Sequence, residues 1–445
     1  MNFFLKHNQN LLLLFLQALI YSGTLFFNLS IIKILYPKET QIIILILTII
    51  YGLSLMSRHG WDIILTRYLP NFIKKNDFYN YKLIIKKSIF NILKNSSILI
   101  LILLVIDYIL KNFFDINIFN NLSNLIYACC LIFLISLHFI FKSIIQSHGK
   151  IKMSLLSEIG SVHLFSTFII AAMFYLNIQI NIDLIIITMI TTSVILNLLN
   201  YLIVLYLENC FFDTQNTNNI IFKENKYQKI LPSYFLNTLS NYIFEWGVFY
   251  AFFILKLNEG SALFFSAMQS KFFVVFFFVA FVRKYSHKFS VNIEEKNIIK
   301  LSMLIKSFNT NVFLLSIIVL MLFISFNNEL ISLMYKTSLK DINMMCLSFV
   351  FFEVIYLLFG CPQTIGMLSK YHYLFSRINF IVSILYFFSQ LITIYLFGVW
   401  GGIFTFGFFY IIKNIISSYF IYKKIKIVTL NDFLIKIYRG LKYFI

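Results

Sequence analysis

The chain has 445 residues, of which 60% are hydrophobic and 12% are charged, and its mean hydropathy is +0.84. These values lie far outside the range of soluble globular proteins and indicate an integral membrane protein. Its apolar runs have the length that crosses a bilayer as a helix, and they lack the short alternating pattern of an outer-membrane barrel. We therefore expect an all-α polytopic membrane protein.

The formal net charge is +19, which could suggest a nucleic-acid partner. The basic residues, however, lie in short segments between the apolar runs and not on one soluble face, so we expect no nucleic acid. The five cysteines form no CxxC or histidine-containing pattern, and we expect no metal site, disulfide framework or cofactor. The N-terminal KHNQNLLLLFLQALIYSG has the look of a signal peptide but no clear cleavage site, and we interpret it as a first transmembrane helix.

Twelve membrane spans fit the apolar pattern. In chain order they cover about residues 11–35, 41–66, 88–110, 123–145, 153–176, 184–207, 231–255, 262–282, 307–326, 342–368, 378–397 and 403–422. With the N-terminus inside, 26 lysines and arginines outside the spans fall on the cytoplasmic side and 5 on the outer side. This positive-inside bias predicts that both termini are cytoplasmic.

A polar break after the sixth span divides the chain into two halves. We expect a six-helix lobe at 1–207, a cytoplasmic linker at 208–230, a second six-helix lobe at 231–422 and a basic cytoplasmic tail at 423–445. IIKILYPKETQIII after span one is echoed by FILKLNEGSALFFS after span seven. Six spans per half would make the two copies parallel repeats.

Ionisable residues inside the spans are costly and mark candidate functional positions. Span two carries Arg58 and Asp62, which are four residues apart and can pair on one helical face. The deepest further charges are Glu158 and His163 in span five, Glu245 in span seven, Lys271 in span eight, Glu353 in span ten and Lys413 in span twelve. Lys33, Lys94 and Lys142 lie near span ends, where we expect their ammonium groups to reach the interface.

Polar side chains recur at helical spacing in three spans. The stripes are Gln17, Tyr21, Thr24 and Asn28; Tyr234, Asn237, Asn241 and Glu245; and Asn379, Ser383, Tyr386, Gln390 and Thr393. Such stripes either form hydrogen bonds between helices or line a hydrated cavity. Together with deep charges in both halves, they favour a cavity between the lobes on which Arg58, Lys271 and Lys413 converge.

The sequence resembles the Wzx-type polysaccharide flippases of the multidrug/oligosaccharidyl-lipid/polysaccharide (MOP) exporter superfamily. KILYPKETQIIILILTIIYGLSLMSRHGWDIILTRYLP is similar to the family's opening pattern, with Lys33, Pro37, Gly60 and Arg67 at its marked positions. IIQSHGKIKMSLLSEIG, LPSYFLNTLSNYIFEWGVFYAFFILKLNEGSALFFSAMQSK, LFGCPQTIGMLSKY and YLFGVWGGIFTFGFFY are similar to later family segments. The sequence departs from the pattern at Tyr36 and at Ile42 to Ile44, where glycines are usual, so the outer turn has a different shape here.

The resemblance implies a two-lobed, MATE-like bundle in the bacterial inner membrane that moves an undecaprenyl-diphosphate-linked oligosaccharide by alternating access. It implies membrane lipids, a polysaccharide polymerase and a chain-length regulator as partners. We expect cavity cations at Arg58, Lys271 and Lys413, with Arg67 and Lys33 near the two mouths, because a diphosphate needs fixed positive groups. Asp62, Glu158, Glu245 and Glu353 would hold these cations or take up a coupling H⁺ or Na⁺.

Three other functions remain open from the sequence. A drug or cation antiporter of the same superfamily would have the same halves, although several deep cations disfavour a cationic cargo. A lipid-linked peptidoglycan precursor flippase usually has fourteen spans, whereas twelve fit here. An enzyme is disfavoured because no loop offers paired acids or a nucleophile with a base.

Overall fold

The structure is a computed structural model that describes residues 19–20, 22–32, 34–35, 37–114, 119, 122–211, 230–334 and 340–429. Helices connected by short turns make up this described part of the chain, and it contains no strand. A helix satisfies its backbone hydrogen bonds internally, as a segment that crosses lipid must. The predicted all-α class is confirmed. The first part of the predicted first span, Lys33, most of the predicted linker and the end of the basic tail lie outside the described residues.

The contacts divide the chain into two compact units, Met1–Leu239 and Ser240–Ile445, and each is described here by itself. The division falls inside helix α10, Leu231–Ile254, which begins at the residue where the sequence predicts the second lobe.

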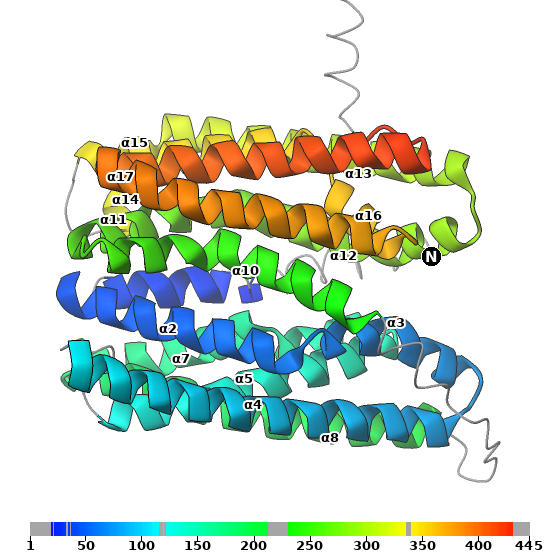
Figure 1. Ribbon diagram of the computed structural model, residues 1–445, viewed down its shortest axis with the longest axis horizontal. Coiled ribbons are helices and arrows are strands. Elements are labelled where there is room, and N and C mark those ends of the chain that lie inside the picture. Colours follow the sequence, from blue (N-terminus) through cyan, green and yellow to red (C-terminus); the bar gives the residue numbers. More distant parts are fainter. Residues whose placement is uncertain are drawn as a thin grey trace, which may run out of the picture. The chain divides into compact units, whose positions relative to one another are not determined.

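The first unit is organised around one helix, α5, Leu122–Ser147, which packs against α2, α3, α4 and α8. Its other helices are Ser22–Ile32; α2, Pro37–Arg58; α3, Trp61–Lys74; α4, Phe78–Phe114; α6, Ile151–Ser154; the 3₁₀ turn η1, Leu155–Ser157; α7, Ile159–Tyr175; and α8, Ile182–Phe211 (Figure 1). Two of the predicted spans are broken here. Span two ends at Arg58 and resumes at Trp61, and span five is interrupted at Glu158.

The second unit packs α15 against α11, α13 and α17, and α12 against α13. Its helices after α10 are α11, Asn258–Met268; the 3₁₀ turn η2, Gln269–Lys271; α12, Phe272–Glu294; α13, Ile298–Ser325; α14, Asn327–Met334; α15, Lys340–Leu357; α16, Pro362–Leu368; and α17, His372–Ile425. The helices α15 and α16 are bent by 49° at the break between them. The predicted span eight is interrupted by η2.

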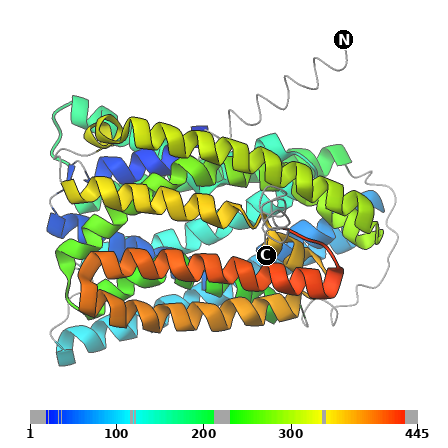
Figure 2. The same cartoon turned by 90° about the horizontal axis from the view of Figure 1, so that it is seen from above.

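The longest element, α17, is two helices joined at Gly398, whose backbone is non-helical at φ 59° and ψ −140°. Its two arms lie side by side in both views (Figures 1 and 2). The Gln390 amide donates to Gly402 O at 2.9 Å, and Thr405 donates to Thr393 Oγ1 at 2.8 Å. The two arms correspond to the predicted spans eleven and twelve.

Six of the described helices are long and apolar enough to cross a membrane as they stand, or seven if α15 and α16 form one span. The other predicted spans correspond to short apolar helices, to helices with a break, or to the two arms of α17. Counting the 22–32 helix, each broken span once and each arm of α17 separately, the described helices fit the twelve predicted spans, six to a lobe. The chain is a multi-pass membrane protein.

Candidate functional site

The predicted pair of Arg58 and Asp62 is present in the first unit. Arg58 Nη1 lies 2.7 Å from Asp62 Oδ2, and Arg58 Nε donates to Ser54 O at 3.2 Å. The pair does not lie on one continuous helix, because Arg58 ends α2 and Asp62 lies in the first turn of α3. Gly60 between them has φ +82°, a backbone conformation that favours glycine. Arg58 is only 6% exposed, so its charge is compensated in a largely dry environment.

A second ion pair lies close by and was not predicted. Lys142 Nζ is 3.0 Å from both carboxylate oxygens of Glu158. The expectation that Lys142 extends to the membrane interface is therefore wrong, because a buried carboxylate draws its ammonium group inward. Lys142 and Arg58 also share one aromatic neighbour, with Arg58 Cζ 3.9 Å and Lys142 Nζ 5.4 Å from the centre of the Phe139 ring.

Uncharged polar groups surround the second pair. His138 Nε2 lies 3.1 Å from the backbone O of Glu158, and His138 Nδ1 lies 3.2 Å from Asn197 Oδ1. Asn200 Oδ1 accepts a hydrogen bond from Ser157 at 2.7 Å. These contacts fix the break in span five, where Glu158 is the extended residue that precedes α7. The sequence does contain a signal for this network, because an apolar run carries two polar residues, His138 and Lys142, four positions apart.

A third polar cluster joins three helices of the first unit. His163 Nε2 is 2.5 Å from the Tyr51 hydroxyl, and His163 Nδ1 is 3.1 Å from Thr24 Oγ1. The imidazole stacks on Phe27 at a ring distance of 4.7 Å. Of the first predicted stripe, Thr24 and the buried Asn28 are thus placed among helices, whereas Gln17 and Tyr21 lie outside the described residues.

Arg67 lies on α3, two turns beyond the helix break. Its side chain is exposed and its guanidinium donates to the Tyr234 hydroxyl, which belongs to the same unit. Its predicted place at the mouth of a cavity stays a prediction. Lys33, the other predicted mouth residue, lies outside the described residues.

In the second unit, Lys413 lies deep in the returning arm of α17 and is 3% exposed. Its ammonium group donates to Asn241 Oδ1 at 2.8 Å and lies 4.5 Å from the centre of the Phe244 ring. Phe244 in turn stacks on Tyr386. An amide oxygen and an aromatic face therefore stabilise this cation.

Lys271 is the last residue of η2, which turns the middle of the predicted span eight into a tight 3₁₀ conformation. It is 6% exposed, and its ammonium group lies 5.0 Å from the Phe406 ring centre and 5.8 Å from that of Phe272. Glu353 is close enough to interact electrostatically with Lys271 and with Glu245. Its Oε1 accepts a hydrogen bond from Tyr410 at 3.3 Å.

These residues bring four predicted charges into one electrostatic cluster of the second unit: Glu245, Lys271, Glu353 and Lys413. Glu353 is buried, whereas Glu245 is exposed on α10. Among the residues that the structure describes, no carboxylate lies within 4.0 Å of the ammonium group of Lys271 or Lys413. Within this described part, Lys271 and Lys413 thus lack the direct ion pair that Arg58 and Lys142 of the first unit have.

The third predicted stripe does not line an open cavity. Asn379, Ser383, Tyr386 and Gln390 are fully buried inside the second unit, and Gln390 joins the two arms of α17. Gln390 and Thr393 form the hydrogen bonds between helices that the alternative interpretation predicts, whereas Ser383 donates to Phe380 O of its own helix. In the described residues, no group of three or more metal-ligating side chains is close enough to hold a metal ion.

Comparisons with known proteins identify the fold. No family model matches the sequence, and no curated protein matches it. Solved structures of transporters match over nearly the whole chain. An outward-facing multidrug resistance MATE family transporter of the MOP superfamily matches with a TM-score of 0.66 at 13% identity, covering 94% of this chain and 95% of that one. An inward-facing one matches with a TM-score of 0.62 at 13% identity, covering 93% and 98%.

The chain has the MATE fold. A MOP superfamily transporter from Pyrococcus furiosus also matches, with a TM-score of 0.67 at 12% identity, covering 94% of this chain and 95% of that one. That structure is described as having a binding pocket of reverse polarity, which suggests a different function for that protein. The MATE fold confirms the predicted architecture of twelve transmembrane helices in two six-helix lobes.

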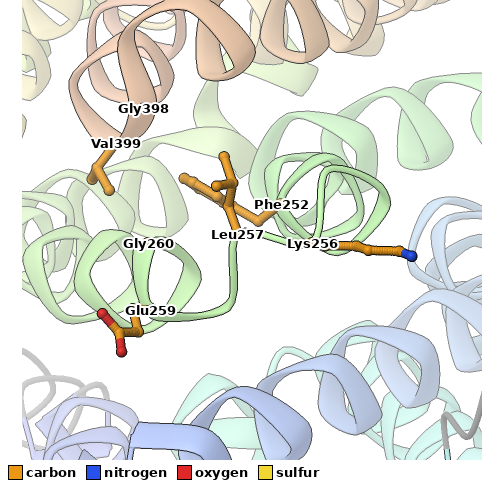
Figure 3. Close-up of a pocket in the computed structure, with 7 residues that line it drawn as sticks. All are labelled: Phe252, Lys256, Leu257, Glu259, Gly260, Gly398 and Val399. Carbon is orange, nitrogen blue, oxygen red and sulfur yellow. The ribbon is translucent and has the colours of Figure 1, made fainter.

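One cavity of this MATE-fold chain lies away from the deep charges. It has a volume of about 340 Å³ and is lined by Phe252, Lys256, Leu257, Glu259, Gly260, Gly398 and Val399, at the α10–α11 turn and the joint of α17 (Figure 3). The charged ends of Lys256 and Glu259 point away from each other, and both side chains are exposed. The cavity therefore offers no convergent charged site.

Proposed function

We propose that this protein is a flippase that translocates an undecaprenyl-diphosphate-linked oligosaccharide, such as an O-antigen or capsule repeat unit, across the bacterial inner membrane. The MATE fold supports a transporter, and inward-facing and outward-facing structures of a multidrug resistance MATE family transporter support alternating access as the mechanism. The strong positive-inside bias supports cytoplasmic termini. A polysaccharide polymerase and a chain-length regulator are the expected partners.

The observation that carries this proposal is the state of the two cations in the second unit. Lys271 and Lys413 are buried, yet among the described residues each is held by aromatic rings or an amide oxygen and not by a carboxylate within 4.0 Å. A buried ammonium group is costly unless an anion compensates it. An anionic cargo would supply that compensation, whereas a cationic drug would add repulsion. A lipid-linked diphosphate has the charge that fits this arrangement.

The carboxylates of the same cluster suit a coupling role. Glu353 is buried, its Oε1 accepts a hydrogen bond from Tyr410, and Glu245 is exposed one turn from Asn241. We propose that this pair takes up the H⁺ or Na⁺ that drives the cycle. The combined variant Glu245→Gln with Glu353→Gln tests it. We expect transport to lose its dependence on the pH or sodium gradient, and an unchanged dependence would remove this role.

The Pyrococcus furiosus transporter supports the choice of an anionic cargo over a drug antiporter. Because that protein of the same fold is described as having a reversed pocket polarity, the fold is not limited to one sign of cargo. The positive charge at Lys271 and Lys413 supports an anionic cargo for this chain.

The test is complementation of a host strain from which the gene has been removed. We expect such cells to stop displaying surface glycan while they continue to build the lipid-linked unit on the inner leaflet. The wild-type chain should restore display, and the double variant Lys271→Met with Lys413→Met should not. Lys300→Met, an exposed lysine at the start of α13, is the matched control and should restore display. Continued glycan display in the deleted strain would exclude the proposal.

A further inference from the structure

A second cavity of the second unit is an apolar groove between α10 and the first arm of α17, before Gly398. It has a volume of about 240 Å³. Tyr242, Ile243, Gly247 and Tyr250 line it from α10, and Phe387 and Phe388 line it from α17. The described residues that line the groove carry no charge, so its chemistry suits an apolar ligand.

The polar atoms of the groove wall are already paired. The hydroxyl oxygens of Tyr242 and Tyr250 lie 2.7 Å apart, and their rings meet edge to face with centroids 6.4 Å apart. Gly247 lies between them in the sequence and leaves space beside their rings, because it has no side chain. A Cβ atom there would come within 3.4 Å of Ile243 Cγ2 and Phe387 Cδ2. A hydrocarbon in the groove therefore leaves neither hydroxyl without a partner.

The groove is continuous with an exposed apolar face of the first arm of α17. That face recurs at intervals of three or four residues and consists of Ile381, Leu385, Phe388, Ile392 and Tyr395. Phe388 belongs both to this face and to the groove. The groove lies within the seventh and eleventh predicted spans, at a depth where hydrocarbon surrounds a membrane protein.

The groove also faces away from the polar stripe of α10. Ile243 and Gly247 are each two residues from Glu245, which places them about 200° around the helix from that carboxylate. Asn241, which holds Lys413, is likewise two residues from Ile243. The lipid bilayer, and not the surroundings of the deep charges, is therefore what meets the groove.

The size of the groove decides what fills it. A partner helix over the eight residues from Tyr242 to Tyr250, about 12 Å long and about 10 Å in diameter, would need roughly 900 Å³. A buried water needs two to four polar partners, which these paired hydroxyls and rings do not supply. An empty groove would forfeit the dispersion contacts of its walls. A single hydrocarbon chain satisfies all three conditions.

We propose that this groove binds one acyl chain of a phospholipid from the surrounding bilayer, which packs between α10 and the first arm of α17. The inference does not rest on the proposed function. Ile243 and Phe387 are the sequence neighbours of Phe244 and Tyr386, whose stacked rings are 4.6 Å apart. Since Lys413 lies against the Phe244 ring, the bound chain supports the ring stack that positions this cation.

Affinity in this groove comes from packing. A chain that leaves the bilayer gains no hydrophobic driving force, because it was already in hydrocarbon. Losing about ten optimal carbon–carbon contacts corresponds to about a tenfold loss of affinity. A side chain that occupies the groove should therefore lower occupancy by about that factor.

The experiment is photolabelling of the full chain in vesicles of phosphatidylethanolamine and phosphatidylglycerol. The probe is a trace of phosphatidylethanolamine with a diazirine in its acyl chain, and peptide mapping locates the label. We expect label on α10 near Gly247 and on α17 near Phe388. Gly247→Leu, whose side chain fills the groove, should lower the labelling of α10 by about tenfold.

Three variants show whether such a loss comes from the groove. Ser97→Leu adds the same side chain at an exposed position of α4 and should label as wild type does. Phe388→Ala removes a wall at an exposed position and should also lower the labelling of α10. Tyr250→Phe keeps the ring and should label α10 as wild type does. Thermal unfolding checks each fold, and Phe388→Ala decides if Gly247→Leu does not fold.

Two results would overturn the inference. If folded Gly247→Leu and Phe388→Ala label α10 as strongly as wild type, the label reports bulk lipid contact and the groove is not a site. If undecaprenyl phosphate displaces the probe at lower concentration than unlabelled phosphatidylethanolamine does, the occupant is a polyprenyl chain and not a phospholipid. Transport is not measured in either case, so failure of the proposed function leaves the test intact.

Discussion

Gly23 and Gly160 lie against each other where the 22–32 helix crosses α7. A Cβ atom on Gly23 would come within 2.6 Å of the Gly160 carbonyl oxygen, and one on Gly160 would come within 2.3 Å of the Ile20 carbonyl oxygen. The obstacles are backbone atoms, which cannot rotate away. Small residues allow this close approach of membrane helices.

Gly160→Ala should therefore destabilise the first unit. Forcing two packed helices apart costs about 1–3 kcal/mol. Thermal unfolding in detergent measures the loss, and Gly149→Ala is the control, because a Cβ atom at Gly149 would meet nothing within 4 Å. Gly149 has φ +72°, so its variant reports backbone strain alone. Equal stability of Gly160→Ala and wild type would show that the helices are not in close contact in the membrane.

Lys413→Met should reduce transport without reducing the stability of the protein. A buried ammonium group without a compensating anion is costly, so replacing Lys413 with an apolar side chain of similar length should not lower stability. Transport should fall at least about tenfold if the ammonium group contacts an anionic cargo. Thermal unfolding and surface glycan display measure the two effects. A parallel loss of stability and display would instead indicate a structural role for Lys413.

His148 should make the stability of the first unit depend on pH. It lies just after α5, outside the candidate spans, and burial lowers the pKa of His148 below its usual value of 6.5. Its Nδ1 lies 2.9 Å from Ile144 O, and its Nε2 lies 3.4 Å from the Tyr81 hydroxyl. Below pH 6.5 the unfolded chain binds a proton that the folded chain rejects, so stability falls as the pH falls.

The measurement for His148 is the free energy of unfolding from about pH 8 to about pH 5. The slope below the usual histidine pKa should become shallower in His148→Gln, which cannot take up the proton. His287→Gln is a second histidine variant that shows how much of the slope belongs to histidines in general. An identical slope in wild type and His148→Gln would contradict the prediction.

Gly398→Ala tests backbone strain at the joint of α17. Space is not the constraint, because a Cβ at Gly398 would meet nothing within 4 Å. The φ of 59° with ψ of −140° is a conformation that only glycine adopts readily, and the cost for alanine is of order 1–3 kcal/mol. Thermal unfolding of Gly398→Ala should show this loss. A variant as stable as wild type would mean that the joint adopts another conformation.

The sequence was sufficient for the architecture because the hydrophobic pattern of a membrane helix is strong. It predicted the start of α10 and the bounds of α5 to within a few residues. Hydropathy did not show where spans break, because a short polar turn such as Gln269–Lys271 is averaged out in a window of about 19 residues. It also placed the start of the third span at residue 88, whereas α4 begins at Phe78, because an amphipathic extension beyond the membrane does not raise mean hydropathy.

The candidate site was predictable in its residues and less so in their partners. The pair of Arg58 and Asp62 was predictable from the sequence, because the two residues are four positions apart. Lys142 and Glu158 are distant in sequence and meet only because span five breaks at Glu158. The aromatic partners of Lys271 and Lys413 could not be identified among so many phenylalanines. The convergence of Arg58 with Lys271 and Lys413 joins residues of two units and stays a prediction.

The two arms of α17, which correspond to the last two predicted membrane crossings, form one hydrogen-bonded hairpin. The bonds from Gln390 to Gly402 and from Thr405 to Thr393 lock the arms close to the Gly398 joint. Lys413 lies on the returning arm, well away from that joint. We expect these bonds to transmit a movement of Lys413 to both arms, so that the eleventh crossing moves together with the twelfth.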